Sequence, residues 1–242
     1  MAMEMLNVTT GEHISRVYIY DGLDSFCGDT AGQSELAPQE TGEMQVQAGI
    51  PQNIVVERNS KADVVILIMP GVSCDIKLDV SLVGENAEAN IYGTYVCGAD
   101  ERVKIAVDMH HDVPHCNSRQ LFKGIAGGSS RVDFYGKIIV AQDAQKTEAY
   151  QENHNILLTD DAKVNTKPQL EIYADDVKCS HGATIGRLNE EEQFYMRSRG
   201  ITLEDAKVLQ MISFLAPVLE AIPDPQQRET ISQQLESAIR KL

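Results

Sequence analysis

Side chains that could bind a metal ion lie close together between Asp108 and Cys116. This stretch contains three histidines, two aspartates and one cysteine. In an extended strand Asp108, His110 and Asp112 would share one face, and nitrogen and oxygen ligands of this kind suit zinc or iron. The same stretch also fits the solvated polar end of a strand before Pro114. The spacing therefore leaves both interpretations open.

A second pair of candidate metal ligands is Cys179 and His181. One residue separates them, so strand alternation places the thiol and the imidazole side by side on one face. Iron–sulfur and zinc chemistry accepts both groups. Two ligands do not complete a site, so further ligands would have to come from elsewhere in the chain or from another subunit. A cysteine and a histidine at a strand end, without metal, are the alternative.

Motifs for nucleotide binding and for hydrolysis are absent from the sequence. The glycine-rich stretch from Lys123 to Gly128 lacks the lysine and hydroxyl placement that holds phosphate and magnesium, and we expect it to be a loop between strands. No His-Glu-x-x-His, Gly-x-Ser-x-Gly or kinase motif set occurs. Hydrolase and kinase functions therefore have no specific support.

Charge and hydropathy exclude further classes of protein. The chain of 242 residues carries a formal net charge of −15, which would repel nucleic acid and anionic lipid. Its longest apolar run, from Val64 to Met69, stops at Pro70 and is too short to span a membrane. The N-terminus has no secretory pattern, and five widely spaced cysteines fit a reducing compartment. We expect a cytoplasmic protein without a nucleic acid or membrane partner.

The elements that would position these residues divide the chain into three parts. Residues 1–52 are weakly patterned, with one strand candidate at 16–20 and a predicted loop or poorly ordered stretch over 21–49. Residues 53–188 contain short runs rich in Val, Ile and Tyr, separated by turn residues, which indicates strands. The predicted strands cover 54–57, 63–69, 74–82, 87–96, 103–109, 131–140, 147–158, 163–173 and 177–184.

The strand-rich region restricts the fold class. It contains no crossover helix, which excludes a doubly wound α/β fold. A β-sandwich, a β-barrel and a β-solenoid remain open. Aromatic residues are scarce, and the candidates for inward positions are mostly Val, Ile and Ala. Stacks of similar aliphatic side chains suit a narrow solenoid core, so the composition favours the solenoid.

Residues 189–242 change to helical periodicity and form the third part. Asn189, Thr202 and Asp224 are placed to cap three successive helices. The second helix carries an apolar stripe that includes Val208, Met211, Leu215 and Leu219. We expect the three helices to pack at the end of the β region as a small helical domain.

Four long segments point to a known family. They cover residues 118–125, 143–151, 166–186 and 194–201. These segments closely resemble the C-terminal signature of the SufB/SufD family of iron–sulfur cluster assembly proteins. The sequence Cys179-Ser180-His181 is SufD-like, whereas SufB typically has a His-Glu-Ala-Thr form. The resemblance covers about residues 53–242 and is poor over 1–50, and the chain is too short for the N-terminal helical domain of family members.

The resemblance implies a mainly β fold: a right-handed parallel β-helix, that is a β-solenoid, followed by a small C-terminal helical domain. In the family, SufB and SufD pair through the β-helix, and each binds a SufC ATPase through its C-terminal helices. The complex is a scaffold for building an iron–sulfur cluster, and neither protein is itself an enzyme. His181 matches the family histidine implicated in cluster assembly at the subunit interface, and Cys179 is its neighbour in the motif.

The resemblance therefore implies a SufD-like scaffold subunit that pairs with a SufB-like subunit or with itself and docks a SufC-like ATPase. The cluster would be transient and shared with a partner, with none tightly bound in the isolated chain. The residues expected to contact the ATPase are Phe194, Tyr195, Val208, Met211, Leu215 and Leu219.

Two alternatives come from other functional classes. The first is a structural docking protein for an ABC-type ATPase, with no metal contact. The second is a carbohydrate-active β-helix enzyme, for which the sequence shows no pair of acid and base carboxylates.

Overall fold

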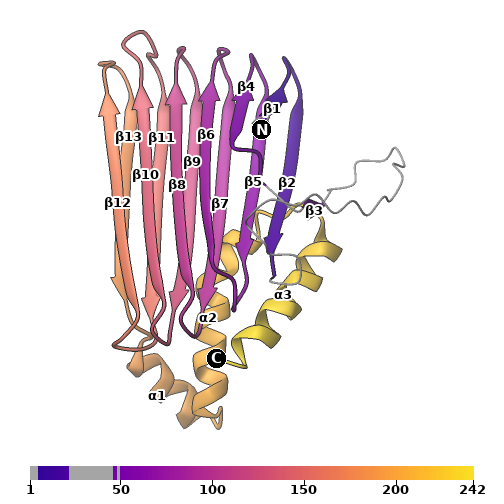
Figure 1. The fold of residues 1–242 in the computed structure, drawn as a ribbon, viewed down its shortest axis with the longest axis vertical. Helices are drawn as coiled ribbons and strands as arrows, with labels where there is room; N and C mark the ends of the chain where they lie inside the picture. Colours follow the sequence, from indigo (N-terminus) through magenta and orange to yellow (C-terminus); the bar gives the residue numbers. More distant parts are fainter. Residues whose placement is uncertain (1–4, 22–45, 48–49) are drawn as a thin grey trace.

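A computed structural model describes residues 5–21, 46–47 and 50–242, in which parallel strands form two sheets (Figure 1). Sheet A has the strand order β1 (Met5–Val8), β4 (Asn53–Val56), β6 (Cys74–Leu82), β8 (Arg102–His111), β10 (Arg131–Val140) and β12 (Lys163–Ile172). Sheet B has the order β13 (Lys178–Gly186), β11 (Glu148–Leu157), β9 (Asn117–Ala126), β7 (Glu88–Cys97), β5 (Lys61–Ile68), β2 (His13–Tyr20) and β3 (Val46–Gln47).

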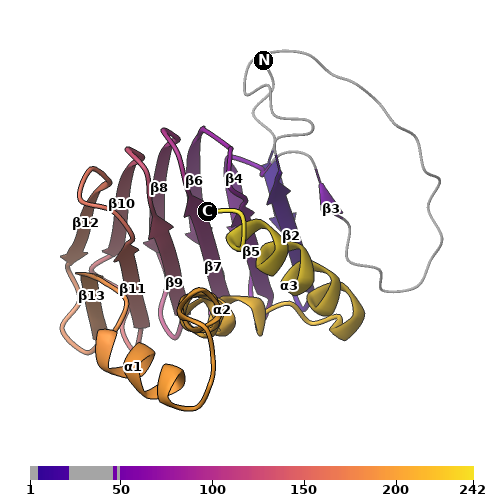
Figure 2. The same cartoon turned by 90° about the horizontal axis from the view of Figure 1, so that it is seen from below.

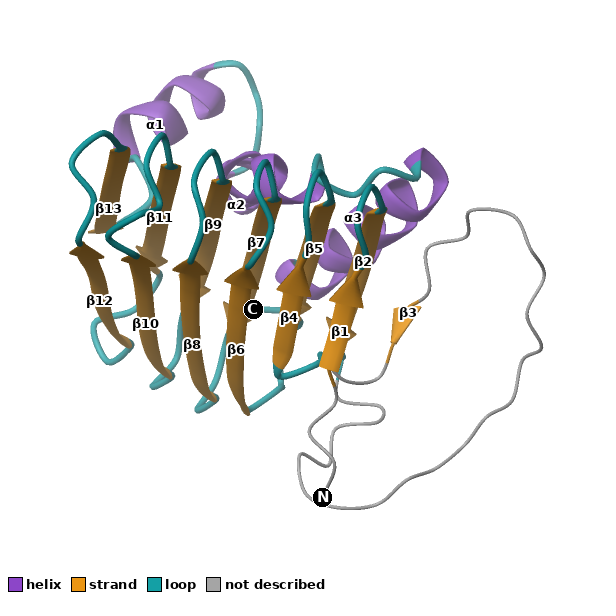
Figure 3. Cartoon of the chain, turned by 90° about the horizontal axis from the view of Figure 1, so that it is seen from above, coloured by secondary structure: helices purple, strands orange, loops and turns teal. Residues whose placement is uncertain are grey.

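From β4 onward, successive strands alternate between the two sheets, so the chain winds as a parallel β-solenoid. Figure 3 shows the sheets face to face, with the helices on the side of sheet B. Every second side chain points between the sheets. Ile76, Ile105 and Phe134 are in register on three strands of sheet A and are all buried, forming one column of the core. The predicted mainly β fold, a β-solenoid with a C-terminal helical region, is confirmed.

The tight turns from sheet A to sheet B repeat one backbone feature. Asn59, Asn86, His115 and Lys146 have positive φ angles of 54°, 59°, 61° and 60°. Gly11 occupies the same place in the first rung, with a φ of 80°. A residue in the left-handed region reverses the chain within a few residues. One histidine of the 108–116 stretch therefore has a backbone role in a turn.

Two strands from the weakly patterned N-terminal segment belong to the solenoid. β1 pairs with β4, and β2, which contains the predicted strand at 16–20, pairs with β5. The solenoid therefore begins before residue 53, ahead of the predicted boundary of its core. Most of the predicted loop over 21–49 lies outside the described residues.

The sequence pattern does not predict strand β9, although its residues match the family motif. The end of β9, from Lys123 to Ala126, falls in the stretch expected to be a loop, and that expectation is wrong. The inward positions of β9 include Ser118 and Gln120, which are polar but buried. Polar residues on the inner face remove the apolar–polar alternation by which strands are recognised.

Three helices follow the solenoid: α1 (Glu190–Ser198), α2 (Leu203–Leu219) and α3 (Pro225–Ile239). Asn189, Thr202 and Asp224 each accept hydrogen bonds from backbone N–H groups of the first helical turn, as predicted. Such caps satisfy donors that a helix leaves unpaired at its start. Within the described part of the chain, no helix is long and apolar enough to cross a lipid bilayer.

The helices lie on the side of sheet B, and α2 and α3 cover part of its outer face (Figure 2). Val65 and Leu121 of the sheet belong to the same buried cluster as Leu215 of α2 and Leu235 of α3. The expectation that the helices pack at the end of the solenoid is therefore wrong. Outward positions of β2, β5, β7 and β9 are apolar here, and burying them against α2 and α3 is favourable.

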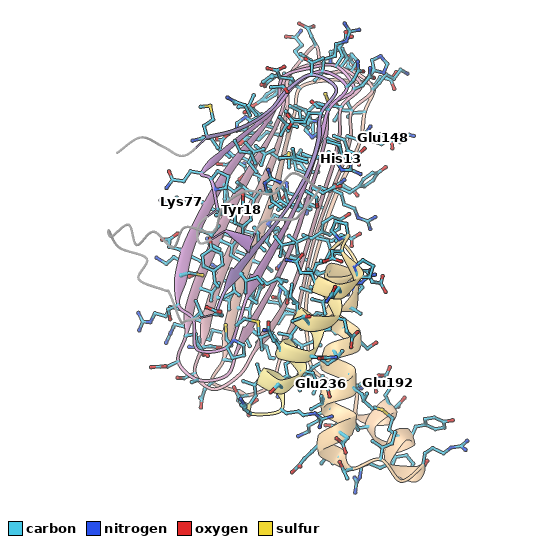
Figure 4. The ribbon with its side chains drawn as sticks, turned by 90° about the vertical axis from the view of Figure 1, so that its right-hand side faces the viewer. His13, Tyr18, Lys77, Glu148, Glu192 and Glu236 are labelled. Atoms are coloured by element: carbon cyan, nitrogen blue, oxygen red, sulfur yellow. The ribbon has the colours of Figure 1, made fainter. Side chains whose placement is uncertain are left out.

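The two outer faces of the solenoid differ as a result. Lys77 projects from the outer face of sheet A, whereas Glu148 lies on the opposite side, above the helices that carry Glu192 and Glu236 (Figure 4). Sheet A has no helix on its outer face among the described elements.

Candidate functional site

Strands β12 and β13 form the last rung of the solenoid, and no described strand pairs beyond them (Figure 3). Inward side chains of this rung are therefore partly uncovered. Ile185 is 46% exposed and Ile172 is 38% exposed. Their register partners one rung earlier, Asn155 and Val140, are buried. The solenoid thus ends in an open face with apolar side chains, the kind of surface that commonly binds another protein.

Cys179 and His181 lie on the inward face of β13 at this open end. Cys179 is in register with Ala149 and His181 with Gln151, and both partners on β11 are buried inside the solenoid. Residues in parallel register lie on the same face of a sheet. Cys179 packs against the core and is partly buried, whereas His181 is exposed. The structure therefore brings the two predicted ligands together on one accessible face.

The thiol of Cys179 is not activated as a nucleophile or ligand. Burial raises its pKa, while a hydrogen bond with the backbone of Ala149 acts in the opposite direction. The thiol is therefore protonated at neutral pH and would have to release its proton to bind iron.

The described residues supply an incomplete donor set for a metal ion or cluster. No group of three or more His, Cys, Asp or Glu side chains suited to a metal ion exists among the described residues. One thiol and one imidazole match the ligand preferences of iron, but tetrahedral iron in a cluster needs further ligands. Completing the site would take sulfide or groups other than those of the described residues, for example groups from a second subunit.

The free edge of β13 presents the backbone N–H and C=O groups of Cys179 and His181. Lys178 donates its N–H to the carbonyl of Thr147, so the backbone of Lys178 points toward β11. Successive residues of a parallel strand bond alternately to its two sides. The backbone groups of Cys179 and His181 therefore face the unpaired edge. A partner strand added at this edge would lie next to both residues.

The free edge of β12 is less suited to accept a strand. The backbone N–H groups of Lys163 and Tyr173 donate to Ser130 and Val140, on the β10 side. Even-numbered residues of β12 therefore face the free edge. Pro168 is one of them and has no N–H to donate. Of the two edges at the open end, β13 presents the more complete row of hydrogen-bonding groups.

A group of hydrogen-bonded polar side chains lies inside the solenoid near this end. The hydroxyl of Tyr95 is bonded to Asn155 Oδ1 and accepts a hydrogen bond of 3.3 Å from Asn153 Nδ2. Asn155 Nδ2 donates to Asn153 Oδ1 at 2.7 Å and to the carbonyl of Thr184, on the last strand, at 3.2 Å. Burial raises the pKa of Tyr95, so the hydroxyl stays neutral. These bonds tie β13 to the interior.

The sequence pattern identifies none of these interior residues in advance. The sequence feature that could have identified them is their spacing. Gln151, Asn153 and Asn155 lie two, four and six residues after the buried Ala149, so strand alternation places all of them on the face of Ala149. Alternation alone does not show which face of a strand is inward when both faces are polar.

The structure separates the side chains of the 108–116 stretch. His111 points into the solenoid and is buried, whereas His110 lies on the outer face, with Nε2 3.4 Å from Asp79 Oδ2. β8 ends at His111, so Asp112 lies in the following turn and does not share the strand face with Asp108 and His110. The described residues include no group of three metal ligands here. The stretch is a strand end followed by a turn, but it is not wholly solvated, because His111 and Cys116 are buried.

The six residues expected to contact an ATPase fall into two groups. Phe194 and Tyr195 of α1 are 73% and 60% exposed. The four residues of α2 are buried in the cluster with sheet B, namely Val208, Met211, Leu215 and Leu219. Their apolar stripe is covered within the chain itself, because the outer face of sheet B packs against it.

A groove of about 860 Å³ lies between α1 and α2. Its lining includes Tyr195 and Met196 of α1, Leu209 and Phe214 of α2, and Ile156 of β11. Leu209 is 48% exposed, which makes it an apolar residue of α2 that a partner could reach. The helical region therefore still presents apolar surface, on the side of α1 and next to the end of β11.

Comparisons with known proteins agree with the motifs. A family model described as SUF system FeS cluster assembly, SufBD core domain, matches residues 38–214. The chain is 46% identical to the iron–sulfur cluster assembly protein SufD of Escherichia coli (strain K12) over 143 residues, which are 59% of this chain and 34% of that protein. It is 47% identical to an iron–sulfur cluster assembly SufBD family protein of Synechocystis sp. over 110 residues, which are 46% of this chain and 24% of that protein.

A plant relative extends the comparison. Protein ABCI7, chloroplastic, of Arabidopsis thaliana is 38% identical over 151 residues, which are 62% of this chain and 32% of that protein. The aligned region thus spans about a quarter to a third of the length of the curated relatives that it matches.

Proposed function

The chain belongs to the SufBD family of the SUF system for iron–sulfur cluster assembly and is close to SufD, and from this premise we propose that it is a SufD-like subunit of a cluster assembly scaffold. The observation that carries the proposal is the position of His181 and Cys179 on the inward face of the last strand, at the open end of the solenoid. The cluster is the cargo of this site. It is held transiently, because this chain supplies one imidazole and one thiol and a second subunit supplies the rest.

The second subunit is a SufB-like protein or another copy of this chain, and it pairs at the open end. Two features support this pairing: the apolar side chains left uncovered there, such as Ile185, and the unpaired edge of β13. Strand addition at this edge would satisfy backbone groups and would place the partner's ligands beside His181 and Cys179.

A SufC-like ATPase docks on the helical region, at the groove between α1 and α2. Tyr195 and Leu209 supply exposed apolar side chains there, and Phe194, next to Tyr195 on α1, is exposed as well. The buried residues of α2 act indirectly, because they hold α2 against sheet B and so set the position of the groove. The ATPase would hydrolyse ATP, whereas this chain acts as a scaffold and not as an enzyme.

The reducing conditions that this chemistry needs place the protein in the cytoplasm. The described cysteines form no disulfide with one another, which fits such a compartment. The alternative function is a structural docking protein for an ABC-type ATPase without metal contact. A docking protein would use the same helical groove as the proposed scaffold subunit, but His181 would not bind a cluster.

The test is cluster assembly by the complex of this chain with its SufB-like and SufC-like subunits. Anaerobic addition of iron and sulfide should produce the charge-transfer absorbance of a cluster. His181→Ala should lower the cluster yield while the subunits stay assembled, since loss of an exposed imidazole should cost about 1 kcal/mol of stability or less.

His13→Ala is the matched control, because His13 is an exposed histidine of β2, toward the opposite end of sheet B from β13 (Figure 3). It should leave the yield unchanged. Normal cluster yield in the His181 variant would reject the ligand role and favour the docking protein. Loss of the ATPase from the complex is measured separately with Tyr195→Ala.

A further inference from the structure

Two glutamines inside the solenoid lie in the same column of side chains as His181. Gln120 on β9 is in register with Gln151 on β11, and Gln151 is in register with His181 on β13. Both glutamines are buried, at 0% and 1% exposure, whereas His181 is exposed. Toward the open end, the column therefore runs from two buried amides to an accessible imidazole.

The space for Gln151 is built into the opposite sheet. Gly136 on β10 faces its amide group, and a Cβ atom at position 136 would lie 1.5 Å from Gln151 Nε2. Any side chain larger than hydrogen at this position would occupy the volume that the amide fills. In a close-packed interior, such a matched pair holds the amide in one place.

The hydrogen bond between the two amides leaves one polar atom of each glutamine without a partner. Gln151 Nε2 donates to Gln120 Oε1 at 3.3 Å. Gln151 Oε1 and Gln120 Nε2 are buried and have no partner. A buried polar atom without a partner costs free energy, so each of these atoms needs an explanation. The unpaired acceptor belongs to the glutamine that is one rung from His181, and the unpaired donor belongs to the deeper one.

We propose that Gln151 is a positioning residue for His181: Gln151 Oε1 accepts a hydrogen bond from one ring nitrogen and leaves the other nitrogen free at the open end. A neutral imidazole has one N–H group and one lone pair, so the partner of the N–H decides which nitrogen can bind a metal. Carbonyl oxygens commonly orient ligand histidines in this way. The inference rests on the proposed function, because a nitrogen directed at the open end matters only if iron is bound there.

Nitrogen-15 NMR of the full chain, at one mildly alkaline pH, tests the positioning role without any cluster. His181 should show a ring N–H proton that exchanges slowly with water. Gln151→Met removes the acceptor at similar volume and should abolish this signal, whereas Gln151→Glu keeps an acceptor oxygen and should retain it. Gln169→Met is the control. Gln169 is exposed on β12, in the same rung as His181, and its substitution should leave the signal unchanged.

Gly136→Ala provides a second variant, because its added methyl group displaces the Gln151 amide from the opposite sheet. It should also abolish the His181 signal, so the test does not depend on how the methionine variant folds. Persistence of the ring N–H signal in folded Gln151→Met protein would overturn the positioning role. Absence of the signal from the wild-type chain would overturn it as well.

Cluster assembly by the complex separates this inference from the proposed function. The initial rate of cluster formation should fall about tenfold in Gln151→Met, the effect typical of losing a group that orients a metal ligand. If the NMR signal behaves as expected but His181→Ala builds clusters normally, the hydrogen bond is established and the ligand role is rejected. If His181→Ala abolishes assembly but the signal does not depend on Gln151, the ligand role stands and the positioning role is rejected.

Discussion

Nε2 of His111 and Oγ of Ser118 are joined by a hydrogen bond of 2.8 Å inside the solenoid, across the turn that links β8 to β9. Both side chains are buried, and Nδ1 of His111 has no hydrogen-bond partner. Burial, and to a smaller extent the charge of His110, lowers the pKa of His111 to about 4. The imidazole is therefore neutral at physiological pH and belongs to the core of the solenoid.

Mild acid should destabilise the folded chain through His111. Its pKa in the folded state, about 4, lies below the usual value of about 6.5, so the unfolded chain binds the proton more readily between these values. The stability that neutral His111 contributes is complete above about pH 6.5. It is lost as the pH falls toward about 4, by roughly 3 kcal/mol.

Urea unfolding at several pH values in this range measures that loss. His111→Gln keeps a hydrogen-bonding group without a titrating ring and should flatten the dependence of the unfolding free energy on pH. His110→Gln, one residue away on the outer face, is the control and should keep most of the dependence, because burial is the larger cause of the lowered His111 pKa and the charge of His110 the smaller one. An equally steep dependence in the His111 variant would contradict the assignment.

Removal of the Glu101 carboxylate should loosen two neighbouring turns. This buried side chain accepts hydrogen bonds from the backbone N–H groups of Gly71, Gly98 and Ala99 at 2.9, 3.0 and 2.7 Å. Burial opposes its ionisation, but the N–H groups outweigh burial and lower the pKa. Glu101→Ala should therefore cost about 2 to 3 kcal/mol of unfolding free energy, since the three donors lose a charged acceptor. The exposed neighbour provides the control: Asp100→Ala should change stability by about 0.5 kcal/mol or less in the same thermal unfolding measurement.

A methyl group added at Gly136 should destabilise the interior. Gly136→Ala places a Cβ atom against the buried amide of Gln151, and we expect a cost of about 1 to 3 kcal/mol from overpacking. Gly182→Ala on β13 is the matched control, because no atom lies within 4 Å of the added Cβ. Thermal unfolding of both variants measures the difference, and Gly136→Ala should have the lower melting temperature. Equal melting temperatures would show that the interior accommodates the methyl group.

Truncation of two leucines of α2 should separate stability from binding: one variant should lose stability and the other should lose affinity for the ATPase. Leu215 is fully buried against sheet B, and Leu215→Ala should cost about 2 to 5 kcal/mol of unfolding free energy. Leu209 is 48% exposed in the groove between α1 and α2. Leu209→Ala should leave the melting temperature nearly unchanged and weaken binding of the SufC-like ATPase, as measured by calorimetry. Unchanged affinity in this variant would place the docking surface elsewhere.

Elements whose formation depends on residues close together in the sequence were predictable from the sequence. β6 and β10 have the predicted bounds, because apolar and polar residues alternate in both strands. The caps at Asn189 and Thr202 were predictable for a similar reason, since a cap involves only the first helical turn. β9 was missed because its inward residues are polar, and only the stacked rungs show which of its faces is inside.

The polar column and the packing of α2 depend on residues that are distant in the sequence. Gln120 and Gln151 meet because the length of one rung brings them into register, and Gly136 reaches the same place from the other sheet. The apolar stripe of α2 is visible in the sequence, but its partner is the outer face of sheet B, which exists only after the strands have paired.

Strand alternation, a local property, determined from the sequence alone that Cys179 and His181 share one face. The tertiary structure decided that this face lies at the open end of the solenoid, beside an unpaired strand edge. The exposure of a side chain in a solenoid depends on whether another rung stacks on it, and no property of the residue itself carries that information.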